Sequence, residues 1–469
     1  MMRRLSGEER GIALPMVVAI IAVISTLGFT AAFLVDSQRT MGSRYSGREK
    51  ALAVAEAGIY EYLWHLNKDS KFYEEDGEFI LDGSKPRVHA FQDGFYQLSI
   101  TDPATVNPAV TITATGWPAD DPDNRRTVEM QVHKRQFVQS IFVSGEEKTP
   151  VSGNPVYWIT GDEVWGPMHT NGTLYINGNP VFHDRVTYSG SPPVVTSGSH
   201  PVYQFPDDPQ KVAQLVFPSS NSQLKTFAQL PGGYYYSGRT CILLNGNQVT
   251  IRNKGVAAVT RPLPPNGVIY VDGGTGGTNK WDLSKGNVFV SGTLDGRLTI
   301  AAANDIYITG KDPTNYTYSV ATNTGGIKYS DTDFDPAGGI TDDMLGLVAG
   351  GYVRILHHDW PSASSSSSMA DVAPSNITVH AAIFALNWAF EYEDYDNGSQ
   401  KDVLTMVGSL TQKYRGAVGT FDQYTGKRIT GYLKNYTHDP RMSYDTPPHF
   451  LEPLNAGWEI RSWREAPNP

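Results

Sequence analysis

Four aspartates in the C-terminal half of the chain have the spacing of a calcium-binding loop. They stand at positions 1, 3, 5 and 12 of such a loop, where carboxylate oxygens coordinate Ca²⁺: Asp331, Asp333, Asp335 and Asp342. The pattern is incomplete, because Pro336 replaces the glycine that position six needs for its sharp turn, and the last position is Asp instead of Glu. Two interpretations stay open, a calcium site and a solvated acidic loop, and the departures favour the loop.

Histidines are the other residues suited to metal binding or catalysis. His357 and His358 are adjacent, and adjacent side chains on a strand point to opposite faces, so both are not expected to reach one metal. His169 lies between turn signals without an acidic partner nearby, which indicates a hydrogen-bonded turn histidine and not a catalytic base. The sequence has no nucleotide-binding loop, nucleophile elbow or CxxC motif, and its single cysteine, Cys241, is expected to be a small buried hydrophobic residue. We therefore predict that the protein is not an enzyme.

Three cations near the C-terminus form a further candidate site. Arg415, Lys434 and Arg441 would form a basic cluster if the C-terminal strands bring them together. Each of them has an acid such as Asp439 or Asp445 as an alternative partner. The sequence leaves open whether they face a ligand or neutralise carboxylates of the chain itself.

The composition describes a β-rich body with few charges. The chain has 469 residues, enough for two or three domains, with 46 Gly, 30 Pro and 25 Tyr, and 18% of its residues are charged. This mixture is typical of turn-rich β structure. The formal net charge of −10 argues against general binding to nucleic acids or anionic lipids, because both would repel it.

The element that must position the rest is the apolar run from Ile12 to Val35, in which no residue is charged. As a helix it spans ~36 Å, enough to cross a hydrocarbon core ~30 Å thick. Three arginines precede it, so the positive-inside rule predicts one membrane pass with the N-terminus in the cytoplasm. Apolar residues recur at helical spacing from Met41 to Leu66, which predicts that one helix covers residues 12–66.

The start of the chain resembles a class III, prepilin-type signal. A basic leader, residues 1–11, ends in Gly11 directly before Ile12, and residues 48–58, REKALAVAEAG, are similar to the AEAG stretch of minor pilins and pseudopilins of the PilX class. The resemblance implies that prepilin peptidase cleaves between Gly11 and Ile12. It also implies that the retained helix leaves the membrane and assembles with the helices of other pilin subunits.

Two residues at the start of the mature helix refine this resemblance. Pro15 lies in the first helical turn, where its missing N–H does least harm. Met16 stands at the fifth mature position, where a major pilin usually has Glu. In lacking that acid, the chain resembles minor components located at a filament tip. The resemblance therefore implies a minor subunit that resides in the cytoplasmic membrane before assembly and in an extracellular filament or at the cell surface afterwards.

Beyond the helix, residues 67–139 are predicted to form a small β module. Three runs with alternating apolar residues, 95–100, 110–116 and 126–134, have the spacing of an antiparallel meander. A small sheet of this kind is suited to pack against the helix.

Residues 140–453 show very short strands at close intervals. Within 287–310, six aliphatic residues alternate to one side of three strands: Val288, Val290, Leu298, Ile300, Ile306 and Ile308. Three such strands without a helix between them match one coil of a parallel β-helix. The predicted fold class is α+β: a long helix, a small antiparallel sheet, then a mostly-β domain that is a right-handed parallel β-helix or, alternatively, a β-sandwich. Residues 454–469 are set apart as a C-terminal tail.

Segments of the same region also resemble a bacterial domain that follows prepilin-type N-termini, notably residues 160–172, 412–416 and 431–436. This resemblance implies location and a β-helix-like fold, and it assigns no activity. The predicted function is thus a non-enzymatic minor pilin or pseudopilin of a type IV pilus or related secretion filament. The alternative is a membrane-anchored β-helix protein that binds or cleaves glycans, which a groove lined by exposed aromatics and paired carboxylates would favour.

Overall fold

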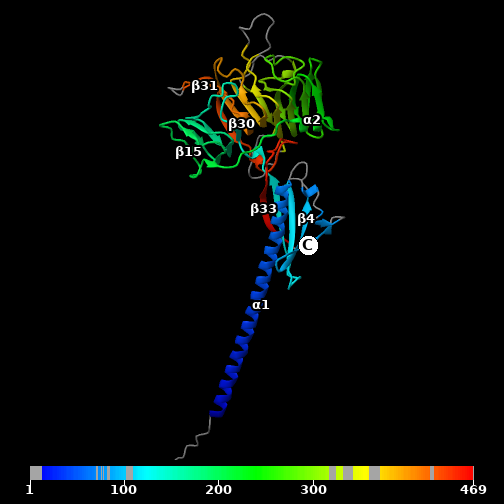
Figure 1. Ribbon diagram of the computed structural model, residues 1–469, viewed down its shortest axis with the longest axis vertical. Coiled ribbons are helices and arrows are strands. Elements are labelled where there is room, and N and C mark those ends of the chain that lie inside the picture. Colours follow the sequence, from blue (N-terminus) through cyan, green and yellow to red (C-terminus); the bar gives the residue numbers. More distant parts are fainter. Residues whose placement is uncertain are drawn as a thin grey trace, which may run out of the picture. The chain divides into compact units, whose positions relative to one another are not determined.

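The structure is a computed structural model that describes residues 13–69, 72–74, 77, 79–81, 85–101, 109–315, 324–330, 342–358, 370–422 and 427–467. The described chain divides into two compact units (Figure 1). Unit 1 comprises residues 13–101, 109–133 and 458–467, and unit 2 comprises residues 134–457. The chain therefore builds unit 2 as an insertion and returns to unit 1 at its C-terminal end.

A single long helix, α1 (Ala13–Lys68), is the main element of unit 1. Its 56 residues correspond to a length of ~84 Å. The large apolar side chains from Leu14 to Val35 are 49–79% exposed, whereas Ala51, Ile59 and Leu66 are fully buried. The long N-terminal helix predicted from the sequence is confirmed, and only its second half is covered by the unit itself.

The buried half of α1 lies against an antiparallel sheet at short range. A β-carbon on Gly58 would lie 2.5 Å from the ring of Tyr96, and one on Gly116 would lie 2.5 Å from the carbonyl oxygen of Ala51. Both positions therefore need glycine for the helix and the sheet to approach this closely. This close packing is the structural role of the AEAG stretch in this chain.

The sheet of unit 1 has five strands: β3 (Val88–Phe91), β4 (Gly94–Thr101), β5 (Ala109–Pro118), β6 (Arg126–Lys134) and β33 (Trp458–Ala466). Strands β3 to β6 pair antiparallel in sequence order, which confirms the predicted small antiparallel sheet. A short hairpin, β1 (Ile80–Leu81) with β2 (Lys85–Pro86), and a 3₁₀ helix (Phe72–Glu74) precede it. The region set apart as a C-terminal tail contributes β33, which lies beside β6.

Unit 2 consists mainly of short strands. They are β7 (Phe142–Glu146), β8 (Trp158–Ile159), β9 (Glu163–Trp165), β10 (Met168–Thr170), β11 (Tyr175–Asn177), β12 (Val181–Phe182), β13 (Val186–Tyr188), β14 (Val194–Val195), β15 (Val202–Tyr203), β16 (Gln210–Lys211), β17 (Tyr234–Ser237), β18 (Thr240–Gly246), β19 (Gln248–Asn253), β20 (Val259–Pro262), β21 (Val268–Asp272), β22 (Val288–Leu294), β23 (Arg297–Ala302), β24 (Ile306–Ile308), β25 (Thr324–Tyr329), β26 (Met344–Ala349), β27 (Val353–Ile355), β28 (Asn376–Ala385), β29 (Phe390–Tyr392), β30 (Gln400–Tyr414), β31 (Gly419–Phe421) and β32 (Arg428–His438). The helix α2 (Ser222–Gln229) and three 3₁₀ helices (Phe137–Gln139, Pro313–Asn315, Pro440–Ser443) complete the described elements.

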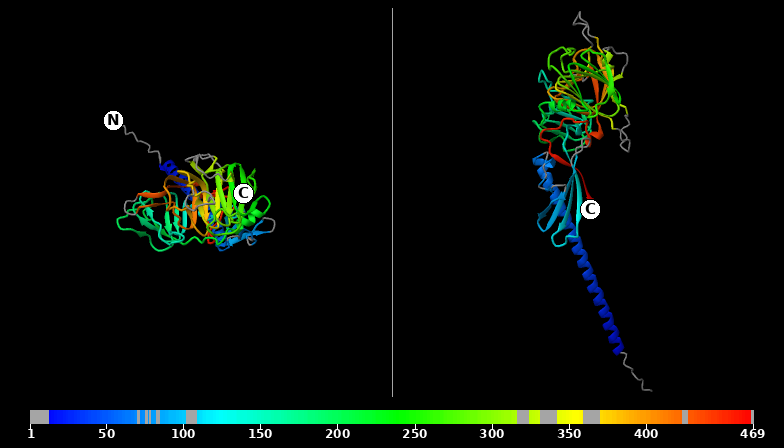
Figure 2. Two further views of the ribbon diagram at one scale, coloured as in Figure 1. Left: turned by 90° about the horizontal axis from the view of Figure 1, so that it is seen from above. Right: turned by 90° about the vertical axis from the view of Figure 1, so that its right-hand side faces the viewer.

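The strands of unit 2 stack in parallel ladders. Figure 2 shows the ribbon of this unit in two further views. One ladder runs β17–β21–β23–β26–β28–β30–β7–β10–β13–β16, and a second runs β18–β22–β24–β27–β29. Among the described strands of this unit, antiparallel pairs occur at β18–β19–β20 and β31–β32. Unit 2 is thus a large, mostly parallel β domain.

The chain enters this stack in its middle. Strand β7 pairs with β30, so that Phe142 lies opposite Leu410, and β9 pairs with β32, so that Val164 lies opposite Tyr436. Residues 142–211 therefore extend the stack in one direction from this junction and residues 234–414 extend it in the other.

One hydrophobic core runs through the ladders. The six aliphatic residues of the segment 287–310 that were expected to alternate to one side are all fully buried in it. The residues between them, such as Phe289 and Tyr307, lie on the opposite face of the strands in a separate cluster. Cys241 is buried in that second cluster, as expected for a small hydrophobic residue.

Candidate functional site

The first candidate site is the exposed half of α1. It is the helix in the described part of the chain that is long and apolar enough to cross a membrane, and its apolar window is not buried by the rest of the protein. Pro15 and Met16 lie in its first turns, and the side chain of Met16 is 63% exposed. Gly11 and Ile12, the predicted cleavage residues, lie outside the described residues.

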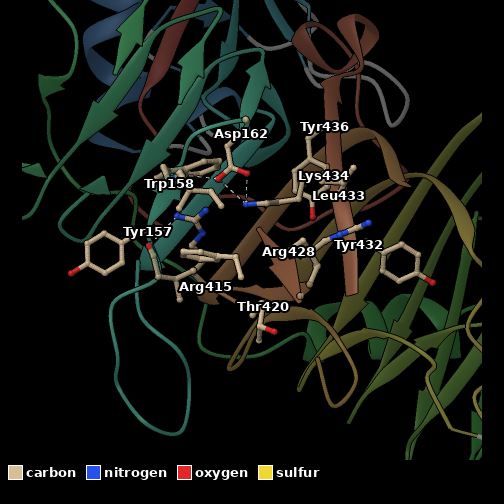
Figure 3. Close-up of a pocket in the computed structure, with 18 of the residues that line it drawn as sticks. Tyr157, Trp158, Asp162, Arg415, Thr420, Arg428, Tyr432, Leu433, Lys434 and Tyr436 are labelled. Atoms are coloured by element: carbon tan, nitrogen blue, oxygen red, sulfur yellow. Dashed lines mark hydrogen bonds and ion pairs between the residues drawn. The ribbon is translucent and has the colours of Figure 1, made fainter. Parts of the chain in front are cut away.

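Two of the three C-terminal cations come together around one indole ring. The guanidinium carbon of Arg415 lies 3.8 Å from the ring centroid of Trp158, and Nζ of Lys434 lies 5.4 Å from it (Figure 3). Each cation has its own carboxylate: Nη1 of Arg415 donates to Oε2 of Glu147 at 2.8 Å, and Nζ of Lys434 lies 2.8 Å from Oδ1 of Asp162. We call this cluster, with the cavity of about 210 Å³ that it borders, the Trp158 pocket.

The third cation, Arg441, is elsewhere, so the three cations do not form one basic cluster. Nη2 of Arg441 donates to Oδ2 of Asp439 at 2.7 Å, and Asp445 binds Arg297 at 2.7 Å. In the Trp158 pocket, burial lowers the pKa of Lys434, and Asp162 opposes that shift. The cations thus neutralise the chain's own carboxylates, the second of the two interpretations that the sequence left open.

His169 belongs to strand β10 and not to a turn. Its side chain is 1% exposed, with Nδ1 at 2.9 Å from Oγ1 of Thr187 and Nε2 at 2.9 Å from Oδ1 of Asn171. Burial lowers its pKa to about 4, so the ring is neutral at pH 7. The hydrogen-bonded histidine was expected, and its place in a strand follows from the pairing of β10 with β7 and β13.

The expectation that His357 and His358 point to opposite faces is wrong. Both residues follow β27 instead of lying within it, and their rings stack with centroids 3.8 Å apart. Nδ1 of His357 lies 2.9 Å from the carbonyl oxygen of Glu393, and Nε2 of His358 lies 3.3 Å from Oδ2 of Asp394. Strand alternation does not apply to them, because the strand ends at Ile355.

The aspartates of the predicted calcium loop are only partly described. Asp331, Asp333 and Asp335 lie outside the described residues, and Asp342 is exposed. Within the part of the chain that the structure describes, no group of three or more His, Cys, Asp or Glu side chains is arranged to hold a metal ion. Calcium binding by this loop stays a prediction.

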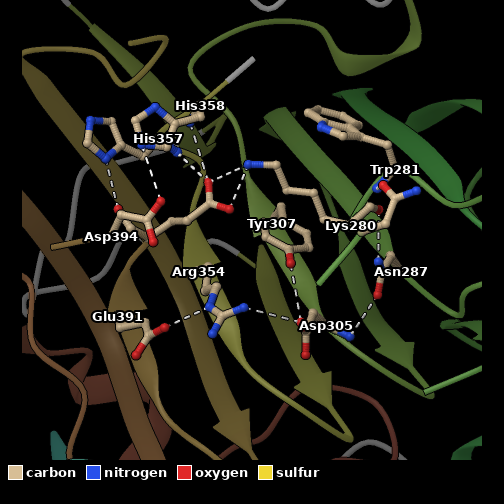
Figure 4. Close-up of polar contacts among 12 residues, drawn as sticks. Lys280, Trp281, Asn287, Asp305, Tyr307, Arg354, His357, His358, Glu391 and Asp394 are labelled. Carbon is tan, nitrogen blue, oxygen red and sulfur yellow. Dashed lines mark hydrogen bonds and ion pairs between the residues drawn. The ribbon is translucent and has the colours of Figure 1, made fainter. Parts of the chain in front are cut away.

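A second charged cluster, which no sequence pattern indicated, lies on the outer face of β24, β27 and β29. Nε of Arg354 donates to Oε1 of Glu391 at 2.7 Å, and Nη1 of Arg354 lies 3.5 Å from Oδ2 of Asp305 (Figure 4). Nζ of Lys280 lies 2.6 Å from both carboxylate oxygens of Glu393. Together these residues line a surface depression with a volume of about 640 Å³. We refer to this depression as the groove.

The carboxylates of the groove differ in their ease of ionisation. Burial raises the pKa values of Asp305 and Glu391, although Arg354 lowers both. Burial also opposes the charge of Glu393, but Lys280 and the backbone N–H of His357 outweigh it and hold the pKa of Glu393 below its usual value. Arg354 therefore binds two carboxylates that take up protons more readily than ordinary ones.

The groove was missed because its residues meet only through strand register. Tyr307 lies opposite Arg354, and Arg354 lies opposite Glu391, although they are 47 and 37 positions apart in the chain. The local signal is an outward polar or aromatic residue between two buried ones in each strand. This signal shows which side chains face outward and not which ones are neighbours.

No protein-family model matches the chain, and no curated protein sequence matches it. Among solved structures, the chain is similar to the crystal structure of the competence-associated pilin ComZ from Thermus thermophilus, with 12% identity and a TM-score of 0.28 over 90% of this chain and 97% of the other. This score is too low to show a common fold. The proposed function therefore rests on the features of this chain alone.

Proposed function

We propose that the protein is a non-enzymatic minor pilin or pseudopilin that joins a type IV pilus or related secretion filament and displays unit 2 outside the cell. The observation that supports this most is the division of α1 into two halves. Its second half packs on the sheet of unit 1, while the apolar side chains from Leu14 to Val35 stay exposed. Exposed apolar surface of this extent needs a lipid bilayer or the helices of other subunits around it.

The same helix serves both environments in turn. Before assembly it holds the protein in the cytoplasmic membrane, with the basic leader of residues 1–11 in the cytoplasm. Prepilin peptidase then cleaves between Gly11 and Ile12, and the exposed half of α1 packs against the helices of neighbouring pilin subunits. This order of events needs no cofactor and no reaction by the protein itself.

A place at the filament tip is part of the proposal. Met16 at the fifth mature position offers no carboxylate to neutralise the N-terminal amine of a neighbouring subunit. In addition, unit 2 adds more than 300 residues to a pilin-like unit 1, a bulk that would crowd the shaft. Both features favour a position at the end of the filament over a repeating one.

We further propose that unit 2 is a right-handed parallel β-helix. Three features support this fold over a β-sandwich, whose sheets are antiparallel. They are the parallel ladders, the continuous core within them, and the second cluster of side chains on the outer face of the strands. Such a stack presents long rows of outward side chains, which suits a domain for display.

The test is the N-terminus of the mature protein, determined by mass spectrometry of cells with and without prepilin peptidase. We expect a chain that begins at Ile12, and we expect it to disappear without the enzyme. An intact Met1, or a cut near Ala32, contradicts the proposal. Immunogold labelling of unit 2 tests the position: label at filament ends supports the tip, and label along the shaft contradicts it.

A second candidate function is a membrane-anchored protein that binds or cleaves glycans. The groove favours its binding form, because it combines aromatic side chains with several carboxylates. The two functions use different parts of the chain, since assembly depends on α1 and the groove belongs to unit 2. An unprocessed N-terminus would leave the second function standing and remove the first.

A further inference from the structure

The groove offers alternating hydrogen-bond acceptors and donors at regular spacing. Arg354 is the register partner of both Tyr307 and Glu391, so these three side chains stand on neighbouring strands about 4.8 Å apart. Asp305 accepts from the hydroxyl of Tyr307 at 3.2 Å and from the backbone N–H of Tyr352 at 2.8 Å. A row of carboxylate, guanidinium and carboxylate groups thus crosses the strands.

Such a row suits ligands whose polar groups both donate and accept. A hydroxyl group does both, whereas a carboxylate only accepts and a guanidinium only donates. Neighbouring hydroxyls on one ring can therefore bind a carboxylate and the adjacent guanidinium at the same time. This pairing is the basis of the expected ligand chemistry.

The charge of the groove disfavours polyanions. Among the described residues that line it, four carboxylates (Asp305, Glu391, Glu393 and Asp394) face two cations, Lys280 and Arg354. Burial lowers the pKa of His358, which leaves that ring neutral at pH 7. Nucleic acids, uronate polymers and sulfated chains would meet net repulsion here.

An aromatic wall stands beside the charged row. The rings of Tyr352 and Trp388 stack in parallel, with centroids 5.4 Å apart and 5° between their planes. The guanidinium carbon of Arg354 lies 3.7 Å from the centroid of Tyr352, while the side chain of Trp388 is 39% exposed. The ring of Trp388 also lies near that of Tyr414, with centroids 6.2 Å apart and 32° between the planes. The part of the indole that Tyr352 and Tyr414 leave uncovered is held in place and open to a ligand.

We propose that the groove binds a neutral oligosaccharide, with one sugar ring stacked on Trp388 and its hydroxyls bound to the row of Asp305, Arg354 and Glu391. The apolar C–H face of a sugar ring fits the indole, and its rim of hydroxyls fits the alternating acceptors and donors. The volume of about 640 Å³ falls within the range of about 300–1,000 Å³ typical of ligand sites. The groove is not enclosed, so a chain of sugars can extend beyond it.

This inference rests on the binding form of the second candidate function and not on the proposed assembly function. Binding would depend on unit 2, whereas processing and assembly would depend on α1. A protein with an uncleaved leader would still bind the sugar, and a properly processed protein with a non-binding groove would still assemble. The two failures are therefore distinguishable.

The experiment uses the full-length chain in a zwitterionic detergent without sugar groups, because maltoside detergents would compete for the groove. Isothermal titration calorimetry measures binding of neutral hexasaccharides of glucose, N-acetylglucosamine, mannose and galactose, and of hexagalacturonate as the anionic counterpart. We expect at least one neutral hexasaccharide to bind with a dissociation constant below about 1 mM, and about tenfold more tightly than hexagalacturonate.

Variants then locate the site. Trp388→Ala is expected to weaken binding about tenfold through loss of the stacking surface. Trp388→Leu keeps apolar bulk without a flat ring and is expected to weaken binding similarly, which covers the case that the alanine variant folds poorly. Trp165→Ala is the matched control, since Trp165 is 46% exposed in the same unit but outside the groove, and we expect unchanged binding.

Three outcomes overturn the inference. The first is that none of the neutral hexasaccharides binds below about 1 mM. The second is that hexagalacturonate binds as tightly as the best neutral chain. The third is that both folded Trp388 variants bind like the unchanged protein, or that Trp165→Ala weakens binding as much as they do.

Discussion

The Trp158 pocket and the groove are built from the same kinds of residue and differ in their access to water. Both place an arginine beside a carboxylate and against an aromatic ring, and both belong to unit 2. In the pocket, the side chains of Arg415 and Glu147 are 4% and 0% exposed. In the groove, those of Arg354 and Glu391 are 21% and 11% exposed.

This difference determines what each set of charges does. In the pocket, Glu147 also accepts from the indole N–H of Trp158 at 3.1 Å and from the hydroxyl of Ser144, so the chain supplies its hydrogen-bond donors. In the groove, water or a ligand has access to the charged row. Similar ion pairs are thus internal supports at one place and lie partly open to solvent at the other.

The largest expected effect is that of Arg415→Ala. This change leaves the carboxylate of Glu147 buried without its cation, so we expect the free energy of unfolding of unit 2 to fall by ~3–5 kcal/mol. Urea unfolding followed by tryptophan fluorescence measures it. Lys225→Ala is the control in the same unit: its side chain is 38% exposed, and the loss of its ion pair with Asp272 is expected to change the free energy far less than Arg415→Ala does.

A double variant tests whether charge is the reason. Glu147→Gln combined with Arg415→Met leaves no buried charge at this pair, so the double variant is expected to lose less stability than Arg415→Ala alone. An equal or greater loss would mean that the destabilisation in Arg415→Ala comes from altered packing around Trp158 and not from the buried, unpaired carboxylate of Glu147.

A smaller effect on the free energy of unfolding is expected from Glu393→Gln, a change in a residue that lines the groove. The change removes the ion pair in which Nζ of Lys280 lies 2.6 Å from Oε1 of Glu393. We expect the free energy of unfolding to fall by about 2 kcal/mol at pH 7. The pKa of Glu393 is lowered on folding, so its stabilisation is present above the ordinary value of 4.5 and disappears as the pH falls through the lowered value. The difference in free energy of unfolding between the variant and the unchanged protein, measured by urea unfolding, should therefore become smaller below pH 4.5.

Glu391→Gln is the matched control, because folding shifts the pKa of Glu391 in the other direction. Its raised pKa means that the charged form is disfavoured in the folded state and that stability falls as the pH rises through this pKa. We expect Glu391→Gln to cost less at pH 7 than Glu393→Gln. If the free energy of unfolding lost in Glu393→Gln stays the same down to low pH, the claim that Glu393 is stabilised in its charged form is wrong.

The elements that position these sites were largely predictable from local patterns. Twenty-four uncharged residues predicted the first part of α1, and the spacing from Met41 to Leu66 predicted the part that packs on the sheet. The alternation from Val288 to Ile308 correctly separated the core face from the outer face. In each case neighbouring residues along the chain carry the whole signal.

The sites themselves were not predictable, because they depend on register between distant strands. Phe142 pairs with Leu410, which places Glu147 beside Arg415 across 268 positions. No local pattern indicates that the chain enters the stack in its middle, or that Trp458–Ala466 returns to the sheet of unit 1. The two histidines illustrate the same limit on a small scale, since their stacking depends on where β27 ends.

The smallest effect on stability is expected from Trp388→Ala, where the contrast between pocket and groove is sharpest. Trp388 is 39% exposed, and the change removes its ring contacts with Tyr352 and Tyr414, so we expect a change of about 1 kcal/mol in the free energy of unfolding. Trp158 is 2% exposed, and Trp158→Ala is expected to cost ~3–5 kcal/mol through the cavity that it leaves. Thermal and urea unfolding of both variants measure this difference. A loss for Trp388→Ala as large as that for Trp158→Ala would mean that the indole of the groove supports the fold, and its open face would then be incidental to that role.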